Sequence, residues 1–453
     1  MWNRPRVLLA APASGSGKTM ITCGLLQALT LRGLRVASFK CGPDYIDPMF
    51  HEKVIGTRSG NLDLFFADAP LLRRLFVRNS AACDISVIEG VMGYYDGMLA
   101  ASDAASSYSV SRALESPTVL IVNARGQSVS ALATLEGFVR FRPDSGVKGV
   151  IFNQMPERIF KELKPQIEAM GVAALGYVPR ADDMVIESRH LGLVTPDEIA
   201  GLSDRLRRLA ALLEQTVDLD ALIALARSAP PLDAPPEPEY PDLPETVVAV
   251  ARDEAFCFLY RDNLALLERL GARLAFFSPI RDRALPAGTQ GLLLCGGYPE
   301  LYAKALSENT AMRAAIRGAI EAGLPTLAEC GGFMYLHAEI EDMEGRFWPM
   351  AGVIPGKVRR TKKLGRFGYI TLSANADTAF LPVGETVRAH EFHYYESDSC
   401  GEALTAVKPD GVRSWACEHA DGALLAGFPH LFYESDPKLI VRFLEKCAGK
   451  GET

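Results

Sequence analysis

The sequence predicts an α/β protein with two domains, each built on a mostly parallel sheet, and three observations support this prediction. The 453 residues are enough for two or three domains of about 150 residues each. Short apolar runs alternate with amphipathic segments, which is the pattern of buried parallel strands joined by helices. The alternation stops at a proline-rich stretch over 228–244 and then begins again.

The first half of the chain supplies the clearest alternation of strands and helices. Its apolar runs are rich in Val, Ile and Leu and short enough to be strands buried on both faces. The predicted strands are Val7–Ala10, Val36–Phe39, Ile85–Ile88, Val119–Val122 and Val147–Phe152. The predicted helices include Met20–Leu31, Val129–Phe141 and Phe160–Met170.

The proline-rich stretch marks the domain junction, because repeated prolines remove backbone donors and favour an extended spacer. We therefore expect a first domain over 1–228, a linker over 229–244 and a second domain over 245–453. In the second domain, Gly, Thr and alternating aromatic residues over 350–430 predict added antiparallel strands before a closing helix at 436–447. The other predicted elements there are strands Val247–Ala251, Leu274–Phe277, Gly291–Leu294 and Pro325–Ala328, and helices Leu259–Leu270 and Ala311–Ala322.

Composition excludes several classes of protein. The net charge is −7, and the densest basic run, residues 359–363, is short and isolated, so we expect a solvated loop there and no nucleic-acid partner. No apolar stretch approaches the roughly 20 residues of a membrane helix, so we expect no membrane association. The nine cysteines lack C-x-x-C spacing in an acidic chain, which predicts reduced thiols and a cytoplasmic protein.

The first chemical signal directly follows the first predicted strand. Residues 12–19, Pro-Ala-Ser-Gly-Ser-Gly-Lys-Thr, lie between a strand and a helix and end in Gly-Lys-Thr, as a P-loop does, with proline at the usual first glycine. Backbone N–H groups of such a loop face phosphate oxygens, the lysine adds charge, and the threonine hydroxyl can bind Mg²⁺. The alternative is a glycine turn with an incidental lysine. The predicted nucleotide-binding residues are Ser14, Gly15, Ser16, Gly17, Lys18 and Thr19.

Two further strand ends of the same sheet carry charged residues. Lys40, Asp44 and Asp47 follow the second predicted strand, at the edge where α/β sheets bind ligands. Glu89 ends the next strand, in the Walker B position. Asp47 and Glu89 together with Thr19 suit a Mg²⁺ ion, which accepts one or two carboxylates besides phosphate and water. As an alternative, these acids are ordinary turn and capping residues. Asn153, at a later strand end, is a candidate for reading an adenine edge.

The second domain carries a candidate nucleophile. Cys330 lies on a predicted strand-to-helix turn, and its neighbours Gly331 and Gly332 permit the tight backbone of a nucleophile elbow. The helix N-terminus is expected to lower the pKa of the thiol. Gly296 and Gly297, at another strand end, predict an oxyanion hole together with the Gly331 amide. Otherwise Cys330 is a small buried hydrophobe.

A cysteine nucleophile needs a base, and the chain has seven histidines. His430 is the best placed, since it follows a probable strand end. His390 and His393 are the rivals. On an alternating strand their side chains point to opposite faces, which argues against a shared zinc site, and no Cys/His cluster has zinc-ligand spacing.

Together these motifs resemble the cobyrinate a,c-diamide synthase family over nearly the whole chain. The resemblance implies a P-loop domain similar to dethiobiotin synthetase, fused to a class I-type glutamine amidotransferase domain. It also implies a corrinoid substrate, with ATP, Mg²⁺ and glutamine. The matching segments are 11–19, 40–48, 61–63, 89–97, 188–193, 296–300, 328–332, 367–369, 390–394 and 429–431.

The resemblance assigns roles to individual residues. Cys330 and His430 match the glutaminase pair, and no orienting glutamate follows the histidine in the pattern of a Cys–His–Glu triad. Lys18, Thr19 and Glu89 match nucleotide and metal positions. Asp44 and Tyr45 are expected to face the substrate, and Lys40 to offset phosphoryl charge beside Lys18. The chain departs from the family pattern at Cys295, Ala389 and Phe432.

The function expected from these features is ATP- and glutamine-dependent amidation of the a and c carboxylates of cobyrinic acid, through acyl phosphates, in cobalamin biosynthesis. One alternative substrate is another tetrapyrrole, of the sirohydrochlorin or hydrogenobyrinic acid type. Another reading is a P-loop switch ATPase with an inactive amidotransferase domain, and a third is a tetrapyrrole carrier. Because two-fold dimers are common among soluble enzymes, we also expect a homodimer.

Overall fold

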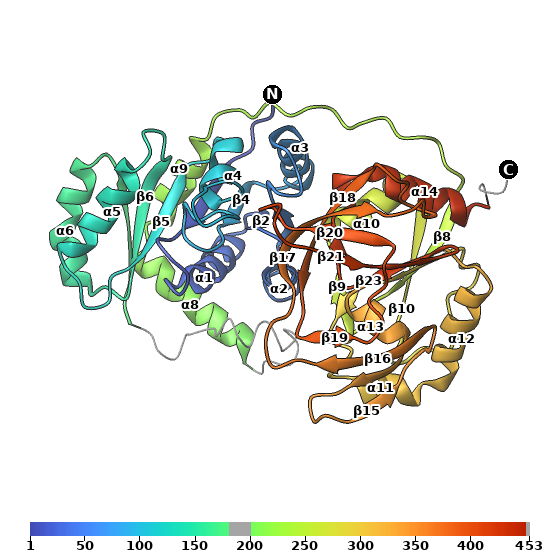
Figure 1. The fold of residues 1–453 in the computed structure, drawn as a ribbon. Coiled ribbons are helices and arrows are strands. Elements are labelled where there is room, and N and C mark those ends of the chain that lie inside the picture. The colour runs from blue at the N-terminus through green and yellow to red at the C-terminus, as the bar shows by residue number, and fades with distance from the viewer. Residues whose placement is uncertain (181–200, 450–453) are drawn as a thin grey trace. The chain divides into compact units, whose positions relative to one another are not determined.

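The computed structural model describes residues 1–180 and 201–449. The chain forms two compact units, Met1–Glu237 and Pro238–Thr453, and each is described here by itself (Figure 1). Both units contain a parallel sheet with helical connections, so the predicted α/β class is confirmed.

Unit 1 is built on one seven-stranded sheet in which every neighbouring pair is parallel. The order β3-β2-β4-β1-β5-β6-β7 places the first strand between β4 and β5. The carboxyl ends of all seven strands therefore share one edge, where loops from distant parts of the chain meet. The strands are β1 Arg6–Ala10, β2 Val36–Cys41, β3 Arg58–Leu62, β4 Ile85–Glu89, β5 Thr118–Asn123, β6 Val147–Asn153 and β7 Ala173–Val178.

Helices connect these strands, and local side chains explain where several of them begin. The Asp68 carboxylate accepts the Leu71 N–H at 2.9 Å and caps α3, and Ser106 caps α4 in the same way. The helices of unit 1 are α1 Lys18–Leu31, α2 Ile46–Phe50, α3 Ala69–Asn79, α4 Ser107–Ala113, α5 Ser130–Arg140, α6 Glu157–Ala169, α8 Leu202–Thr216 and α9 Leu219–Arg227, with a π-helical turn η1 at His51–Ile55.

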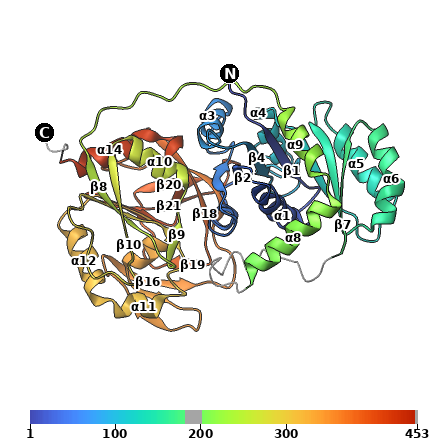
Figure 2. The ribbon, with the colours of Figure 1, turned by 180° about the vertical axis from the view of Figure 1, so that it is seen from behind.

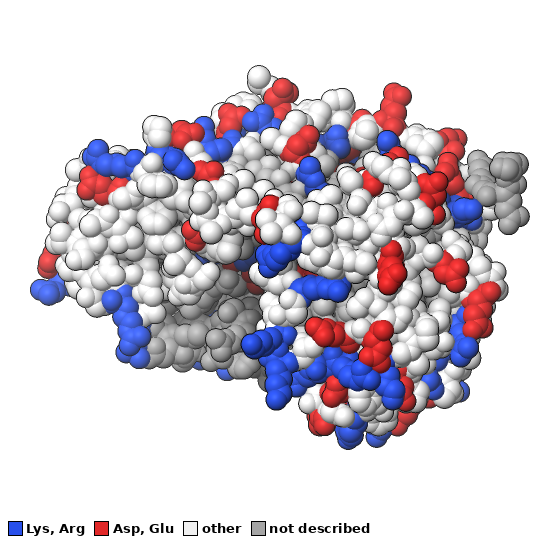
Figure 3. Space-filling view, in the orientation of Figure 1, with Lys and Arg blue, Asp and Glu red and all other residues white. Residues whose placement is uncertain are grey.

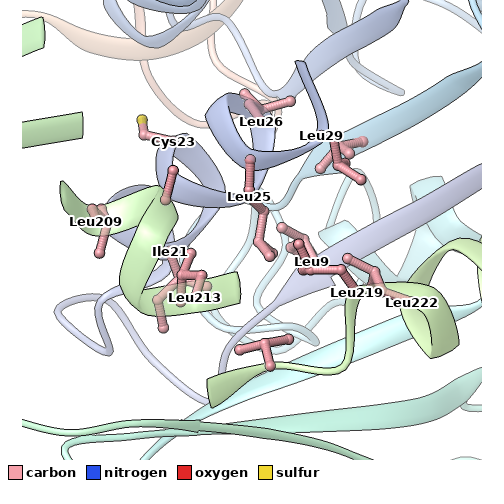
Figure 4. Close-up of a cluster of buried hydrophobic side chains, with 14 of the residues drawn as sticks. Leu9, Ile21, Cys23, Leu25, Leu26, Leu29, Leu209, Leu213, Leu219 and Leu222 are labelled. Carbon is pink, nitrogen blue, oxygen red and sulfur yellow. The ribbon is translucent and has the colours of Figure 1, made fainter. Parts of the chain in front are cut away.

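One face of the sheet is covered by α1, α8 and α9, which bury a shared apolar cluster (Figure 2). Figure 4 shows Leu25 of α1 between Leu213 of α8 and Leu9 of β1. Gly24 allows α8 to approach α1, because a Cβ there would come 2.6 Å from Leu213 Cδ1. This packing fixes the start of α1, and with it the loop that precedes the helix.

Two strands of unit 1 were not predicted from the sequence. Strand β3 has the sequence Arg-Ser-Gly-Asn-Leu, which is too polar to stand out as a buried run. It pairs with β2 along its whole length, and its hydroxyl groups bond to those of β2, as between Ser59 and Ser38 at 2.7 Å. Strand β7, Ala-Ala-Leu-Gly-Tyr-Val, contains few of the β-branched residues that favour strands. Tertiary pairing therefore outweighs the weak local β propensity.

Unit 2 contains a six-stranded sheet in the order β10-β8-β11-β13-β23-β22, parallel except for the edge strand β22. All four strands predicted before residue 330 are present in it, with β9 as an unpredicted short addition beside the sheet. The main-sheet strands are β8 Thr246–Ala251, β10 Ala272–Phe277, β11 Gly291–Leu294, β13 Thr326–Glu329, β22 His419–Asp421 and β23 Leu424–Gly427.

The antiparallel strands expected over 350–430 form two smaller sheets, so this prediction is confirmed. The five-stranded sheet comprises β17 Phe367–Ala374, β18 Thr386–Phe392, β20 Leu404–Val407, β21 Ser414–Cys417 and β24 His430–Leu431. The four-stranded sheet comprises β14 His337–Glu341, β15 Phe347–Pro349, β16 Ile354–Arg360 and β19 Tyr395–Ser397, and β9 Phe256–Phe258 pairs with β12 Gly296–Gly297.

The predicted helices of unit 2 are also present. The helix expected at 436–447 is α14 Pro437–Cys447, whose apolar side packs on β8 and β11. The remaining helices are α10 Arg261–Arg269, α11 Ala303–Glu308, α12 Thr310–Glu321 and the short α13 Gly331–Leu336. Among the helices of residues 1–180 and 201–449, none is long and apolar enough to cross a membrane.

Each end of the proline-rich stretch packs on the unit next to it. Leu232 is buried on unit 1, where its backbone exchanges two hydrogen bonds with Trp2, of 2.8 and 2.9 Å. Tyr240 and Leu243 pack against the apolar cluster of unit 2. The division between the units, at Glu237 and Pro238, falls inside the predicted linker 229–244.

The contact between α1 and α8 leads to a stability prediction. Gly24→Ala should lower the free energy of unfolding of unit 1 by about 1–3 kcal/mol, because a new methyl group overpacks the Leu209 and Leu213 side chains. The matched control is Gly137→Ala in α5, where nothing lies within 4 Å of the new Cβ and helix propensity favours Ala. Differential scanning calorimetry should show opposite shifts of the two midpoints. Equal shifts would contradict the role of Gly24.

Candidate active site

The predicted P-loop lies between β1 and α1, and its backbone has the conformation that the glycines permit. Gly15 and Gly17 have φ of 78° and 89°, in the left-handed region. A Cβ on Gly17 would come 2.1 Å from Asn153 Nδ2, and this amide donates to the Ser16 carbonyl at 2.9 Å. Asn153 therefore holds the loop from the end of β6, and its prediction as an adenine reader stays a prediction. Ser14 is exposed at the tip.

Lys18 begins α1 and its ammonium donates to the Met92 carbonyl at 2.9 Å. Met92 itself has a φ of 49°, so the segment after β4 carries backbone strain next to the P-loop lysine. Burial, together with the charge of Lys40, lowers the pKa of Lys18 to about 8. Among the described residues the Lys18 ammonium forms no ion pair, so it is suited to an incoming anion.

A buried charge cluster joins the other predicted residues of this site. The Lys40 ammonium donates to Asp47 and, at 2.8 Å, to Glu89 Oε1, and the Thr19 hydroxyl donates to the same oxygen at 2.6 Å. Burial alone would lower the pKa of Lys40, but the Asp47 and Glu89 carboxylates raise it well above its ordinary value. The same lysine holds the pKa of Asp47 below its usual value, against the effect of burial. Strands β2 and β4 and helices α1 and α2 meet at this cluster.

His51, in the π-helical turn η1, also faces this cluster, although the sequence indicated it only as one of seven histidines. It is 1% exposed, and its Nε2 lies 3.7 Å from Glu89 Oε2. Neither ring nitrogen of His51 forms a hydrogen bond with another described residue. Glu89 Oε2 likewise has no hydrogen-bond donor among the described residues. Burial lowers the pKa of His51, which favours the neutral ring.

The donor atoms of this cluster allow a test of the predicted Mg²⁺ site. Glu89 Oε2 is a buried oxygen without a hydrogen-bond donor among the described residues, and the Thr19 hydroxyl is its neighbour, so both fit a hard cation. The Asp47 carboxylate instead forms an ion pair with the Lys40 ammonium. The described residues contain no preformed group of three or more His, Cys, Asp or Glu ligands. Thr19 and Glu89 fit the ion, and Asp47 as a ligand stays a prediction.

The two residues expected to face the substrate, Asp44 and Tyr45, lie just before α2. The Asp44 carboxylate accepts the Ile46 N–H at 2.8 Å, and Asn61 fixes the Asp44 carbonyl at 2.7 Å. Burial, together with the nearby Asp47 charge, raises the pKa of Asp44 to about 7. Tyr45 is buried. The substrate role of both residues stays a prediction.

A cavity of about 410 Å³ lies beyond the carboxyl ends of β5 and β6. Its walls come from the segments 124–128 and 154–159, which follow these strands, and from Arg180. Such a hollow, at the ligand-binding edge of a parallel sheet, has the place and size of a site for a planar base.

In unit 2, Cys330 lies between β13 and α13 on the sharp turn that the sequence predicted. Its φ of 46° and ψ of −100° are rare for a residue with a side chain. The Cys330 N–H donates to the Gly427 carbonyl of β23 at 2.7 Å, which locks the turn to the neighbouring strand. A strained conformation held by two strands is typical of a nucleophile elbow.

The three predicted oxyanion glycines lie beside this turn. A Cβ on Gly331 would come 2.9 Å from Gly297 N, so the two backbones approach closely. A Cβ on Gly296 would come 2.4 Å from His430 Cε1. The glycines therefore allow the elbow, the Gly296–Gly297 segment and the histidine to pack against one another.

His430 lies three residues beyond Gly427, whose carbonyl binds the Cys330 amide. Its ring stacks on that of His390, with 4.9 Å between ring centroids, so the favoured histidine and its rival lie side by side. His430 Nδ1 lies 3.9 Å from Glu329 Oε2, and Tyr433 donates to the other oxygen of Glu329 at 3.1 Å. Burial, with the neighbouring His390 and His393, lowers the pKa of His430 well below its ordinary value.

The second histidine rival, His393, belongs to a separate buried network that the sequence did not reveal. Its ring stacks on Phe428, with 3.9 Å between ring centroids. Its nitrogens lie 2.6 Å from the Tyr395 carbonyl and 3.0 Å from Glu391 Oε2, and Trp415 donates to the other oxygen of Glu391. Both ring nitrogens of His393 therefore face acceptor oxygens within this network.

The expected lowering of the thiol pKa is wrong for the ligand-free site. Burial raises the pKa of Cys330 far above its ordinary value, and the carboxyl groups of Glu300 and Glu391 act in the same direction. Burial also raises the pKa of Glu300 to about 7 and that of Glu329 to about 8. The six-residue helix α13 does not offset the loss of water. The thiol is protonated until a base removes its proton.

Comparison with known proteins agrees with the division into two units. Residues 7–193 match the family described as "CobQ/CobB/MinD/ParA nucleotide binding domain", and residues 247–437 match "CobB/CobQ-like glutamine amidotransferase domain". A relative from Salmonella typhimurium, named cobyrinate a,c-diamide synthase, is 40% identical over 96% of this chain and 97% of its own. The chain belongs to the cobyrinate a,c-diamide synthase family.

Other members of this family give the same result. A protein of that name from Caldanaerobacter subterraneus is 37% identical over 98% of both chains, and one from Priestia megaterium is 36% identical over 99% of this chain. The family resemblance drawn from the sequence motifs is therefore confirmed. One of these motifs, residues 188–193, lies outside the described residues, as does His190.

The three departures from the family pattern are accommodated within unit 2. Cys295 is buried at the end of β11, and its thiol donates to the Ala251 carbonyl at 3.5 Å. Ala389 pairs with Leu431 in the five-stranded sheet. The Phe432 ring packs on Tyr260 with 5.5 Å between centroids. None of the three alters the elbow or the stacked histidines.

The raised thiol pKa predicts how Cys330 reacts with an alkylating reagent. In glutamine-free protein the rate of alkylation by iodoacetamide should still be increasing at about pH 9, above the ordinary thiol pKa of about 8.5. Peptide mass spectrometry measures this rate site by site, with the half-buried Cys83 as the internal comparison. A rate at Cys330 that reaches its plateau below about pH 7 would show that the thiolate is already stable in the free site.

Proposed function

We propose that this protein uses ATP and glutamine to amidate the a and c side-chain carboxylates of cobyrinic acid in cobalamin biosynthesis. The observation that carries the proposal is that one chain combines two features. One is a strained cysteine on a turn that packs against the Gly296–Gly297 segment, which also contacts His430. The other is a P-loop facing a buried Lys–Glu cluster. Near-full-length relatives named cobyrinate a,c-diamide synthase support the substrate.

The glutaminase reaction is assigned to unit 2. His430 takes the proton of the Cys330 thiol, and the sulfur attacks the side-chain carbonyl carbon of glutamine. The Gly331 and Gly297 amides would bind the oxyanion of the tetrahedral intermediate, and the close approach of the two backbones supports this assignment. The C–N bond then breaks, ammonia leaves with the proton from His430, and water hydrolyses the glutamyl thioester. A low pKa for His430 in the free site suits a base that must start neutral.

The synthetase reaction is assigned to unit 1. A carboxylate does not react directly with ammonia because oxide is too poor a leaving group. Transfer of the γ-phosphoryl group of ATP to the carboxylate gives an acyl phosphate, and ammonia then displaces phosphate. Lys18 and Lys40 offset charge on the transferred group, and the P-loop amides bind the remaining phosphates. Two such rounds amidate the two side chains.

Several finer assignments belong to this proposal. Bound Mg²⁺ would supply charge neutralisation for the phosphates, and Thr19 and Glu89 would hold it. The cavity lined by segments 124–128 and 154–159 suits the nucleotide base. All nine cysteines are free thiols, in keeping with a cytoplasmic location. We retain the homodimer as a proposal.

Loss of the nucleophile should separate the two reactions. Cys330→Ala should abolish diamide formation with glutamine but retain it with ammonium, because unit 1 needs only ammonia. The measurement is product mass after incubation with cobyrinic acid, ATP and Mg²⁺, and Cys400→Ala, which alters another thiol of unit 2, is the control. If wild-type protein gives no mass change with either nitrogen source, cobyrinic acid is not the substrate.

Loss of the Glu89 charge should impair synthesis in unit 1 and leave glutamine hydrolysis in unit 2 intact. Glu89→Gln keeps the size of the side chain but removes the charge facing Lys40 and Thr19, so synthesis should decrease by about a hundredfold or more with either nitrogen source. Glutamine hydrolysis in unit 2 should stay within twofold. Glu136→Gln, at an exposed ion pair of α5, is the control. Normal synthesis by Glu89→Gln would exclude Glu89 from the phosphoryl-transfer site.

A further inference from the structure

An unassigned surface of unit 2 combines exposed aromatic rings with a basic loop. We call it the aromatic–basic surface. Figure 3 shows Lys and Arg atoms, with Asp and Glu atoms among them, over the region where Figure 1 labels β16 and β19. The residues that define the surface are Lys362, Lys363, Arg366, Phe367, Phe392 and Tyr394.

The aromatic part of the surface consists of three large rings, the middle one of which contacts the other two. Phe367, Phe392 and Tyr394 are 58%, 51% and 47% exposed. Phe367 and Phe392 face each other in the β17–β18 register, with 5.5 Å between ring centroids, and Phe392 lies 6.0 Å from Tyr394. Isolated exposed rings are common, but contiguous exposed rings mark a binding surface.

The basic part is the segment that joins β16 to β17. Within β16, Lys357 pairs with Glu339 and Arg359 with Asp398. Beyond β16 the pattern changes, because the exposed Lys362 and Lys363 form no ion pair with any described residue. Their charges are therefore available to an anionic ligand.

Backbone and ring contacts hold this loop next to the rings. The Thr361 N–H and hydroxyl both donate to the Tyr394 carbonyl, at 2.7 and 2.9 Å. The Arg366 guanidinium lies over the Trp415 ring, 5.3 Å from its centroid. Lys408 donates to the Phe367 carbonyl. The surface is thus anchored at both ends of the loop.

The surface is continuous with the glutaminase site through β18. Phe392 stands two residues beyond His390, on the same face of the strand, and the His390 ring stacks on His430. Glu391, between them, belongs to the buried network with His393 and Trp415. A ligand on the rings would therefore lie on the same face of β18 as His390.

We propose that the aromatic–basic surface binds the corrinoid substrate, with the rings against the macrocycle and the cations at its peripheral carboxylates. A corrinoid has a broad apolar face and a rim of carboxylates, which matches three contiguous rings bordered by three cations. This inference rests on the proposed function and adds a place for the substrate. A single-stranded nucleic acid also prefers cations beside aromatic rings, but the chain has a net charge of −7 and the loop is short.

The test compares two surface variants with one matched control. The charge variant is Lys362→Gln/Lys363→Gln/Arg366→Gln. The ring variant is Phe367→Thr/Phe392→Thr, which places a residue type favoured in strands at both positions. The control is Lys304→Gln/Arg317→Gln/Lys438→Gln, which removes three exposed charges from helices of the same unit. Equilibrium dialysis of the full-length protein measures Kd for cobyrinic acid, and for cobinamide, whose side chains are amides.

The charge variant should bind cobyrinic acid about tenfold more weakly than wild type, while the control stays within about twofold. Its cobinamide affinity should be unchanged, a result that misfolding would not give. The ring variant should weaken binding of both corrinoids. Raising the salt concentration should weaken cobyrinic acid binding in wild type more than in the charge variant.

Diamide formation tests the proposed function, and the Kd values test the aromatic–basic surface, so each proposal can fail without the other. If wild type forms the diamide and the charge variant binds cobyrinic acid as tightly as wild type, the surface does not hold the substrate. If wild type forms no diamide, the proposed function fails, and the Kd values alone then support or overturn the surface. Tighter binding of an oligonucleotide than of cobyrinic acid would also overturn the inference in favour of a nucleic-acid surface.

Discussion

The arrangement of unit 1 depends on one buried ammonium group. Lys40 on β2 is held between Asp47 of α2 and Glu89 of β4, and Glu89 in turn accepts the Thr19 hydroxyl of α1. Removing one partner of a buried ion pair costs about 3–5 kcal/mol because it leaves a charge without compensation. Four elements are therefore fixed around Lys40. The P-loop helix and the acidic segments keep their spacing because this charge must remain paired.

Unit 2 holds the proposed nucleophile, Cys330, on a sharp turn between β13 and α13. The left-handed φ at Cys330 costs of order 1–3 kcal/mol and persists only where the surroundings enforce it. Here the Gly427 carbonyl binds the Cys330 amide, and close approach at Gly296 and Gly331 excludes any side chain. The same packing removes water, which raises the pKa of the Cys330 thiol and lowers that of His430, so the proposed base is a neutral imidazole in the free site.

The two units thus differ in electrostatics as their proposed reactions require. Phosphoryl transfer develops negative charge, and unit 1 provides Lys18 and Lys40 beside oxygens that suit a cation. Thioester formation starts from a neutral thiol and a neutral imidazole, and unit 2 provides a buried site with stacked histidines. The aromatic–basic surface combines exposed aromatic rings with cations that form no ion pair within the described part of the chain, and such a face suits a large polycarboxylate.

The sequence by itself determined the parallel sheets, the P-loop and the elbow at Cys330, because each is encoded within a short segment by apolar periodicity or glycine spacing. It also placed Lys40, Glu89 and His430 at strand ends. Only the tertiary structure decided that Lys40 forms an ion pair with Asp47, that His51 faces Glu89, and that His390 stacks on His430. Strand β3, too polar to be recognised, likewise exists because β2 pairs with it. These features depend on contacts between segments far apart in the chain, and on burial, which no local pattern specifies.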